Sequence, residues 1–390
     1  MIDHPVFLEN PIQDYAWGSK TAIQRLLGKV PDGTPWAELW MGAHPKAPST
    51  VRIGGEPIGL DRLIRQYPEQ ILGHGISRKF DATLPYLFKV LAAGEPLSIQ
   101  AHPDAATAAE GFDRENRLGI PLGAPERNYR DPWPKPEVIC AIEPFIALNG
   151  FRPAADVNEL LGRFCPDLNV GAADLRDLFR TLVTLPEARR ELMIAEIARN
   201  ARANDSEEAR WVLRLHEQYP GDIGMMMPLL LNLIRLEPGQ AMFLPPGRLH
   251  AYLSGVGIEL MGNSDNVLRG GLTRKHMDVN ELMRVLRFDS APVDIIAPVE
   301  VNPSEWRYPL HVEEFRLAVI RTIGPAQGYD GPDLHSAEII LCLDGHAKMI
   351  HGGSPASLGF ARGDALLIPA AARGYRIEGT AALYKASVPV

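Results

Sequence analysis

The sequence predicts a mainly β protein made of two β-barrel domains with one α-helical insertion. Three observations lead to this prediction. Short apolar runs bounded by proline and glycine dominate residues 1–150 and return after residue 294, as is typical of β structure. Apolar residues at helical spacing fill much of the stretch from 154 to 219. Finally, Gly239–Pro245 and Gly363–Pro369 share one arrangement, a glycine, five residues and a proline, which indicates that the same β design occurs twice.

The stretch Gly239–Ser254 reads GQAMFLPPGRLHAYLS and predicts a hairpin whose second strand carries a histidine. An apolar strand over 241–244 ends at a Pro-Pro-Gly turn, where proline presets φ and Gly247 accepts conformations that other residues avoid. The chain then enters a second strand with His250. A small barrel can bring a ligand side chain to its mouth in this way. Taken alone, such a histidine could equally be a satisfied polar residue.

Two further extended segments direct polar groups opposite an apolar face, because side chains alternate along a strand. In PLSIQAHP, Ser98, Gln100 and His102 share one face. In PKPEVICAI, Lys135 and Glu137 share a face by the same rule. Burying these groups without partners costs stability, and a bound cation resolves that conflict for the imidazoles and the carboxylate. We therefore predict one metal site, suited to a borderline divalent ion with zinc first, from four side chains: Gln100, His102, Glu137 and His250.

The helical block is predicted to contain three helices. One has an apolar stripe made of Leu175, Leu178, Phe179 and Leu182. Pro186 opens the second at a position where proline is tolerated, and Asp205 with Glu208 marks the start of the third. The β pattern resumes after the block, which predicts an insertion within a β domain. Shorter helical segments are expected near 58–72 and as a helix pair near 277–288.

These patterns predict a discontinuous metal-binding domain over 1–150 and 225–295, a helical domain over 151–224, and a C-terminal barrel over 296–390. In the C-terminal repeat, Ala371 and Gly374 stand at the positions equivalent to Gly247 and His250. We therefore expect this second barrel to lack metal ligands and to have a structural role. Chance similarity of two β-turns is the alternative, because glycine–apolar–proline runs are common.

Bulk composition argues against several classes of protein. The 390 residues are 46% hydrophobic and 23% charged, which indicates an ordinary globular protein. A net charge of −8 argues against nucleic acid or an anionic membrane as the main partner. No apolar run approaches the roughly 20 residues that span a bilayer. The sequence shows no secretory signal pattern and no CxxC motif, so we expect a cytoplasmic location. We also expect a monomer.

A family resemblance is carried by four motifs: PIQDYAWGS, PLSIQAHPD, KPEVICAIEPFIALNGF and GQAMFLPPGRLHAYLSGVGIELMGNSDNVLRGGLT. Together they resemble the type I mannose-6-phosphate isomerases, zinc enzymes of the cupin superfamily, in a collinear match from about Tyr15 to Thr273. The resemblance implies two cupin-type (jelly-roll) barrels and one Zn²⁺ per chain, held by the four side chains that strand alternation selects. It also implies interconversion of mannose 6-phosphate and fructose 6-phosphate, with a proton moved between C1 and C2 through an enediol-type intermediate.

The resemblance places an active-site arginine at Arg269, whose permanent charge could hold an oxyanion or phosphate. A surface ion pair of Arg269 with Asp265 is the alternative. Lys135 should point toward the metal, and a nearby dication would lower the pKa of its ammonium. The remaining acid–base candidates are Glu259, Asp265 and His44.

For substrate binding we favour Ser98 and Lys89 as a phosphate subsite. A lysine within the apolar strand LPYLFKVL either reaches toward solvent or meets an anion. Trp17 and Tyr252 are expected to flank the sugar, with core packing as the alternative for both.

Two other functions are open to the same residues. Two histidines and a glutamate can form an iron(II) site that activates oxygen, although Gln100 would take a position that an oxygenase leaves open. The barrel could instead bind a sugar phosphate without catalysis, around a structural metal. The many ionisable groups expected near the metal argue against that second alternative.

Overall fold

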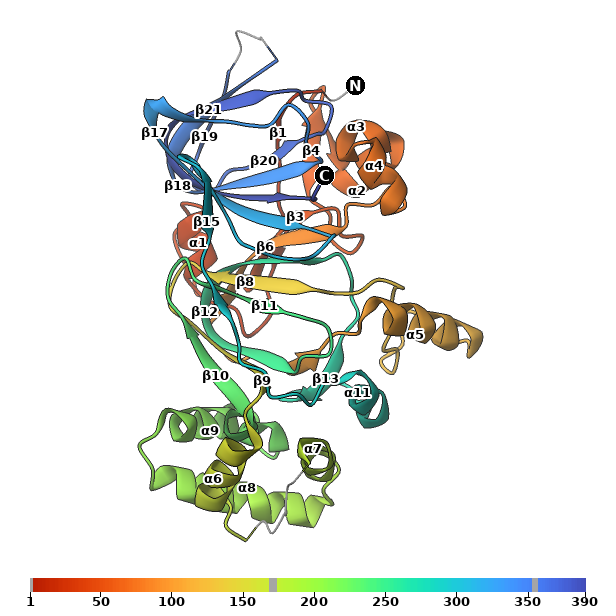
Figure 1. Ribbon diagram of the computed structural model, residues 1–390, viewed down its shortest axis with the longest axis vertical. Coiled ribbons are helices and arrows are strands. Elements are labelled where there is room, and N and C mark those ends of the chain that lie inside the picture. The colour runs from red at the N-terminus through yellow and green to blue at the C-terminus, as the bar shows by residue number, and fades with distance from the viewer. Residues whose placement is uncertain (1–2, 168–173, 353–356) are drawn as a thin grey trace.

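Two large β-sheets and one helical block make up the protein (Figure 1). The computed structural model describes residues 3–167, 174–352 and 357–390. In that part of the chain, an eleven-stranded sheet lies between the helical block and an eight-stranded sheet built mainly from the C-terminal residues. The mainly β architecture with an α-helical insertion agrees with the prediction. The exact domain boundaries stay a prediction.

The eleven-stranded sheet contains three of the predicted metal ligands, Gln100, Glu137 and His250, and His102 directly follows one of its strands. Its strands are β2 (Ile12–Gln13), β3 (Glu38–Gly42), β6 (Tyr86–Ala93), β7 (Ile99–Ala101), β8 (Glu137–Ala141), β9 (Phe145–Phe151), β10 (Leu231–Leu236), β11 (Ala241–Leu244), β12 (His250–Gly262), β13 (Leu268–Gly271) and β14 (Ile295–Ile296). A separate two-stranded sheet pairs β4 (Thr50–Ile53) with β5 (Glu56–Gly59). Strands β7, β8, β11 and β12 coincide with the segments in which the sequence predicted strands.

The central strands of this sheet are buried on both faces, and successive side chains point alternately to one face and the other. On β8, Val138 and Cys140 belong to an apolar core shared with the C-terminal sheet, whereas Ile139 and Ala141 pack in the barrel interior. Glu137 follows the parity of Ile139 and therefore points to the interior as well. The two sheets are joined by this shared core, and Cys140 Sγ lies 2.8 Å from the Tyr308 hydroxyl across it.

Strand β12 bends at Gly255 and so belongs to both halves of the barrel. Residues before the bend pair with β9 and β7, and residues after it pair with β6 and β8. Gly255 has φ of +123°, and a Cβ there would lie 2.5 Å from the carbonyl oxygen of Pro144. Only glycine fits this bend without backbone movement. Across the bend, the hydroxyl of Tyr252 donates to Glu259 at 2.9 Å.

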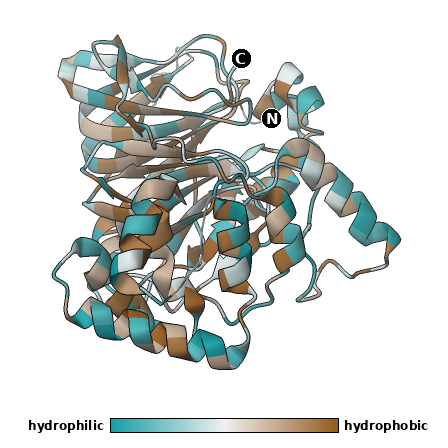
Figure 2. Cartoon of the chain, turned by 60° about the horizontal axis from the view of Figure 1, so that its bottom comes forward, coloured by the Kyte–Doolittle hydropathy of each residue, from teal (hydrophilic) through white to brown (hydrophobic). Residues whose placement is uncertain are grey.

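The helical block is inserted between β9 and β10, which pair with each other directly. It contains α6 (Ala154–Phe164), α7 (Leu175–Val183), α8 (Glu187–Arg202), α9 (Glu207–Gln218), the 3₁₀ helix η1 (Ile223–Met226) and α10 (Met227–Leu230). Its helices carry both hydrophilic and hydrophobic residues (Figure 2), and the predicted stripe on α7 is buried. The start of α9 differs from the prediction, because Ser206 rather than Asp205 accepts the capping hydrogen bond, from the amide of Ala209.

Two smaller helical predictions need correction. The segment 58–72 is not one helix but the end of β5 followed by α2 (Leu60–Gln66) and α3 (Pro68–Leu72). Pro68 disfavours helical geometry at Tyr67, which has φ of −137°, so the helix breaks there. The segment 277–288 forms one helix, α11 (Val279–Val285), rather than a pair. The remaining helices are α1 (Ala22–Leu26), α4 (His74–Lys79) and α5 (Ala105–Arg117).

The C-terminal sheet repeats the design of the first. Its strands are β1 (Val6–Phe7), β15 (Val299–Asn302), β16 (Glu305–Arg307), β17 (Arg316–Asp330), β18 (Glu338–His351), β19 (Ser357–Ala361), β20 (Ala365–Ile368) and β21 (Tyr375–Ser387). The repeated glycines have nearly equal φ, +88° at Gly239 and +90° at Gly363, and each precedes a four-residue strand. An unpredicted feature is that β1, from the N-terminus, pairs with β20.

Replacing Gly255 with alanine tests the bend. Gly255→Ala combines an unfavourable positive φ, which costs about 1–2 kcal/mol, with a clash against rigid backbone that adds about 1–3 kcal/mol. Gly239→Ala is the matched control, because φ is also positive there but nothing lies within 4 Å of the added Cβ. Urea denaturation should show a clearly larger loss in the free energy of unfolding for Gly255→Ala. Equal losses would mean that the close approach at Gly255 is unimportant.

Candidate metal centre

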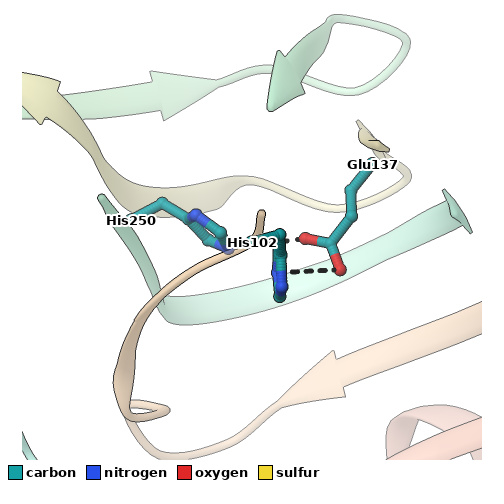
Figure 3. Close-up of side chains that lie close together, drawn as sticks. All are labelled: His102, Glu137 and His250. Carbon is teal, nitrogen blue, oxygen red and sulfur yellow. Dashed lines mark ion pairs between the residues drawn. The ribbon is translucent and has the colours of Figure 1, made fainter. Parts of the chain in front are cut away.

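Three buried acceptor atoms converge at the mouth of the first barrel (Figure 3). His102 Nε2 lies 3.3 Å from Glu137 Oε1, and His250 Nε2 lies 3.4 Å from Glu137 Oε2. The two Nε2 atoms and Glu137 Oε2 are buried, and none of them has a hydrogen-bond partner within the described residues. The three residues come from the end of β7, the start of β8 and the start of β12. The sequence prediction that these side chains meet is therefore confirmed in geometry.

The other ring nitrogens explain why this arrangement calls for a cation. His102 Nδ1 donates to the carbonyl of Asn266 at 2.8 Å, and His250 Nδ1 donates to the carbonyl of Arg248 at 2.9 Å. With the proton on Nδ1, each neutral imidazole presents an Nε2 lone pair. Burial lowers the pKa of His102 to about 4, so its imidazole is neutral at pH 7. Two lone pairs and a carboxylate facing one another are the donor set of a divalent metal, with its outer hydrogen bonds already in place.

Lys135 is the nearest cation to this cluster. Its Nζ lies 3.1 Å from Glu137 Oε1, which confirms that the two side chains share a face. Burial opposes ionisation of Glu137, but the positive charge of Lys135 favours it, and the pKa of the carboxylate lies below its usual range. The carboxylate is therefore ionised in the folded protein and available as a ligand.

A cavity of about 440 Å³ opens onto the cluster. Gln100 lines it and is the register partner of both His250 on β12 and Arg269 on β13. Ser98, Trp17 and Arg269 also line the cavity. No ion pair joins Arg269 to Asp265 among the described residues, so the surface-pair alternative gains no support. Burial and the nearby Arg130 lower the pKa of Arg269.

Lys89 is held by two carboxylates rather than standing free. Its Nζ donates to Glu259 at 2.9 Å and to Glu38 at 3.4 Å, and all three residues are buried. Burial alone would lower the pKa of Lys89, but the two glutamates raise it. Tyr252 donates its hydroxyl to Glu259 at 2.9 Å and is itself 2% exposed. This network does not favour Lys89 as a phosphate ligand, and it occupies Glu259 and Tyr252 in hydrogen bonds.

His44 and Asp265 form a pair on the opposite wall. His44 Nε2 lies 3.6 Å from Asp265 Oδ1, and its Nδ1 accepts from the backbone amide of Lys46. Burial would raise the pKa of Asp265, but His44 and, less strongly, Lys135 lower it to about 2. Asp265 is therefore a weak base at neutral pH.

The structure adds cavity residues that the sequence did not single out. They are Tyr15, Glu38, Trp40, Lys46, Tyr219, Arg274 and Lys275. Glu38 could have been noticed as a lone acid in the apolar strand ELWMG, where its side chain accepts from Trp40 Nε1 at 2.8 Å. Lys275 sits near other cations, and burial together with Arg269, Lys46 and Arg130 lowers its pKa. The cavity mouth therefore carries excess positive charge.

In the second barrel a lysine stands where the first barrel has Glu259, because Lys385 pairs with Ile340 as Glu259 pairs with Ile139. Glu338 pairs with Ile368 as Glu137 pairs with Leu244, so the two glutamates are equivalent in the repeat. Lys385 Nζ lies 3.4 Å from Glu338 and 3.3 Å from Glu305. The second barrel thus neutralises its buried carboxylates with its own ammonium. That this barrel lacks metal ligands stays a prediction.

Together, fold and site define a double-barrelled cupin-type protein with a buried histidine–glutamate–histidine centre of the kind that holds a catalytic metal. Residues 6–154 match the family model described as phosphomannose isomerase type I, catalytic domain. The mannose-6-phosphate isomerase of Salmonella typhimurium is 40% identical, over 88% of this chain and 89% of the relative. That of Rattus norvegicus is 33% identical, over 92% of each. The chain belongs to the mannose-6-phosphate isomerase family.

Solved structures agree with this assignment. A crystal structure of a phosphomannose isomerase mutant from Salmonella typhimurium superposes with a TM-score of 0.93 at 37% identity, covering 99% of this chain and 100% of the other. A zinc-bound holo structure of mannose 6-phosphate isomerase gives a TM-score of 0.92 at 36% identity, with the same coverage. These relatives do not favour the iron(II) or non-catalytic alternatives. Within the described residues, no helix has the length and apolar character to cross a membrane.

Removing the buried ammoniums tests both ion clusters. Lys89→Met leaves Glu38 and Glu259 buried without a counter-charge and should lower the free energy of unfolding by about 3–5 kcal/mol. Lys385→Met should cost about as much in the second barrel. Lys46→Met, at an exposed lysine, is the control and should change stability by about 0.5 kcal/mol or less. The values come from urea denaturation at pH 7. A loss for Lys89→Met no larger than that of the control would contradict the cluster's role.

Proposed function

We propose that this protein is a zinc-dependent isomerase that interconverts mannose 6-phosphate and fructose 6-phosphate. The observation that carries the proposal is the convergence of two buried imidazole Nε2 atoms and Glu137 Oε2, which have no hydrogen-bond donor within the described residues. The family supplies the substrate, and the zinc-bound relative supports the choice of metal. A monomeric state and a cytoplasmic location stay predictions.

His102, Glu137 and His250 are proposed to hold one Zn²⁺ per chain, with Gln100 as the fourth ligand. Gln100 fits because it lines the cavity and pairs in register with His250. When bound, such an ion stabilises negative charge that develops on substrate oxygens or orients the sugar hydroxyls. Asn266 and Arg248 fix the two imidazoles through their carbonyls, so the ligands are oriented before the metal arrives.

The substrate phosphate is proposed to bind cations at the cavity mouth. Arg269 lines the cavity and forms no ion pair among the residues that the structure describes, and Lys275 lies near other cations, so an anion would relieve repulsion at both. Ser98 can donate a hydrogen bond from the adjacent wall. Lys89 already has two carboxylate partners, so its proposed role is to hold the barrel wall rather than the phosphate. Trp17 stays a candidate for packing against the sugar.

Lys135 is the preferred group for moving the proton between C1 and C2. A general base must have a pKa near neutrality, which disfavours Asp265 with its pKa of about 2. Glu259 is bound by Lys89 and Tyr252. Lys135 adjoins the metal centre, with its Nζ 3.1 Å from Glu137 Oε1, so its ammonium is close to where a substrate would meet the ion. His44, paired with Asp265, stays the second candidate.

Two substitutions separate metal binding from turnover. His250→Ala should lose bound zinc and activity together, because it removes a ligand from the set of orphaned acceptors. Arg269→Ala should keep zinc and lower turnover by about 10²–10³-fold, as removal of an oriented charged donor does. Zinc is measured by elemental analysis, and turnover is measured with mannose 6-phosphate in the absence of oxygen, which excludes oxygen-dependent chemistry.

Arg117→Ala, at an exposed position in the last turn of α5, is the control and should match the wild type in both assays. Normal turnover in Arg269→Ala would remove that side chain from the mechanism. Full zinc content in His250→Ala would refute the ligand set, and a zinc-loaded wild type without isomerase activity would refute the function.

A further inference from the structure

A second cavity, of about 450 Å³, lies between the helical block and the loop that follows β13. Arg190 of α8, Gln218 at the end of α9 and the loop residues Arg274 and Lys275 all line it. Arg274 and Lys275 also line the catalytic cavity, as Tyr219 and Thr273 do, so the two cavities share a wall. Arg190 and Gln218 belong to the second cavity alone.

The second cavity is lined by cations that lack a counter-charge. Arg190, Arg274 and Lys275 form no ion pair within the described residues, and Arg190 Nε is buried without any hydrogen-bond partner. The one acid in the lining, Asp222, already accepts from the backbone amides of Gly224 at 2.8 Å and Thr273 at 3.0 Å. Its carboxylate therefore holds the loop in place, and the cavity keeps a net positive charge.

We propose that this cavity binds a phosphate-type anion, either inorganic phosphate or a phosphate monoester, between Arg190 and the shared Arg274–Lys275 segment. The planar guanidinium of arginine matches phosphate oxygens in a bidentate manner, and lysine adds a point charge. The substrate carries a single phosphate, for which the catalytic cavity has Arg269 on its own wall. Arg190 does not line the catalytic cavity, so we do not expect it to bind the substrate phosphate.

Sharing a wall couples the two cavities. An anion beside Arg190 partly neutralises the charges of Arg274 and Lys275, which also line the catalytic cavity. Two anions bound on either side of this wall would in addition repel each other. Linkage then requires that each anion weakens binding of the other by the same factor. The apparent KM for the sugar phosphate should rise with phosphate concentration through this second cavity while kcat is unchanged.

Phosphate binding to the zinc-loaded full chain tests the proposal without using the reaction. Inorganic phosphate is titrated and followed by ³¹P NMR and calorimetry. We expect two classes of site in the wild type. Arg190→Gln should weaken one class by about tenfold or more, because a charge-assisted hydrogen bond is lost. Arg189→Gln, at the exposed neighbouring arginine, is the matched control and should bind as the wild type does. Arg269→Gln should weaken only the other class.

The kinetic readout keeps this inference separate from the proposed function. Without phosphate, Arg190→Gln should show wild-type kcat and KM, and added phosphate should then raise its KM less than that of the Arg189→Gln control. Arg190→Lys keeps the positive charge and should retain most of the phosphate affinity of the second cavity. This variant serves as the test if Arg190→Gln folds poorly. Equal phosphate binding by Arg190→Gln and Arg189→Gln, or loss of all binding in Arg269→Gln, would overturn the proposal. Neither result depends on whether the chain isomerises sugars.

Discussion

The architecture depends on one electrostatic constraint, which is that three buried acceptors must share a cation. His102 and His250 each donate the Nδ1 proton to a backbone carbonyl, and within the described residues no hydrogen-bond donor reaches their Nε2 lone pairs. Glu137 brings a negative charge to the same point. A bound cation offsets the cost of burying all three at once, and among the described residues Lys135 is the ammonium paired with Glu137. Metal binding and folding of the barrel mouth should therefore stabilise each other.

The two barrels satisfy the same constraint in different ways. Glu137 and Glu338 occupy equivalent register positions, so both barrels place a buried carboxylate at the end of the same strand pair. In the second barrel the ammonium of Lys385 neutralises it, and Tyr375 adds a hydrogen bond of 2.6 Å. A built-in cation leaves no position open for a ligand. The first barrel instead leaves the cation to be supplied from outside, which is what makes it able to do chemistry.

Sequence reasoning located the metal centre because the features that define it are local. Alternation along a strand places Gln100 with His102 and Lys135 with Glu137, and turn chemistry starts the strand at His250. The network around Lys89 could not be predicted, because Glu38 and Glu259 lie 51 and 170 residues away in the chain and meet it only through strand order. The helix break at Pro68 and the N-cap at Ser206 were missed for a different reason. Several nearby residues could have ended or capped these helices, and the sequence pattern alone does not show which one does.

The helical insertion has more than a covering role, because it completes walls that the barrels leave open. Tyr219, just after α9, donates its hydroxyl to the carbonyl of Pro96 at 2.7 Å, next to the segment that carries Ser98 and Gln100. Asp222 holds the backbone amide of Thr273 on the other side. The same short stretch of chain therefore anchors both the polar strand of the metal centre and the cationic loop. A change in this stretch would therefore affect both of these cavity walls together.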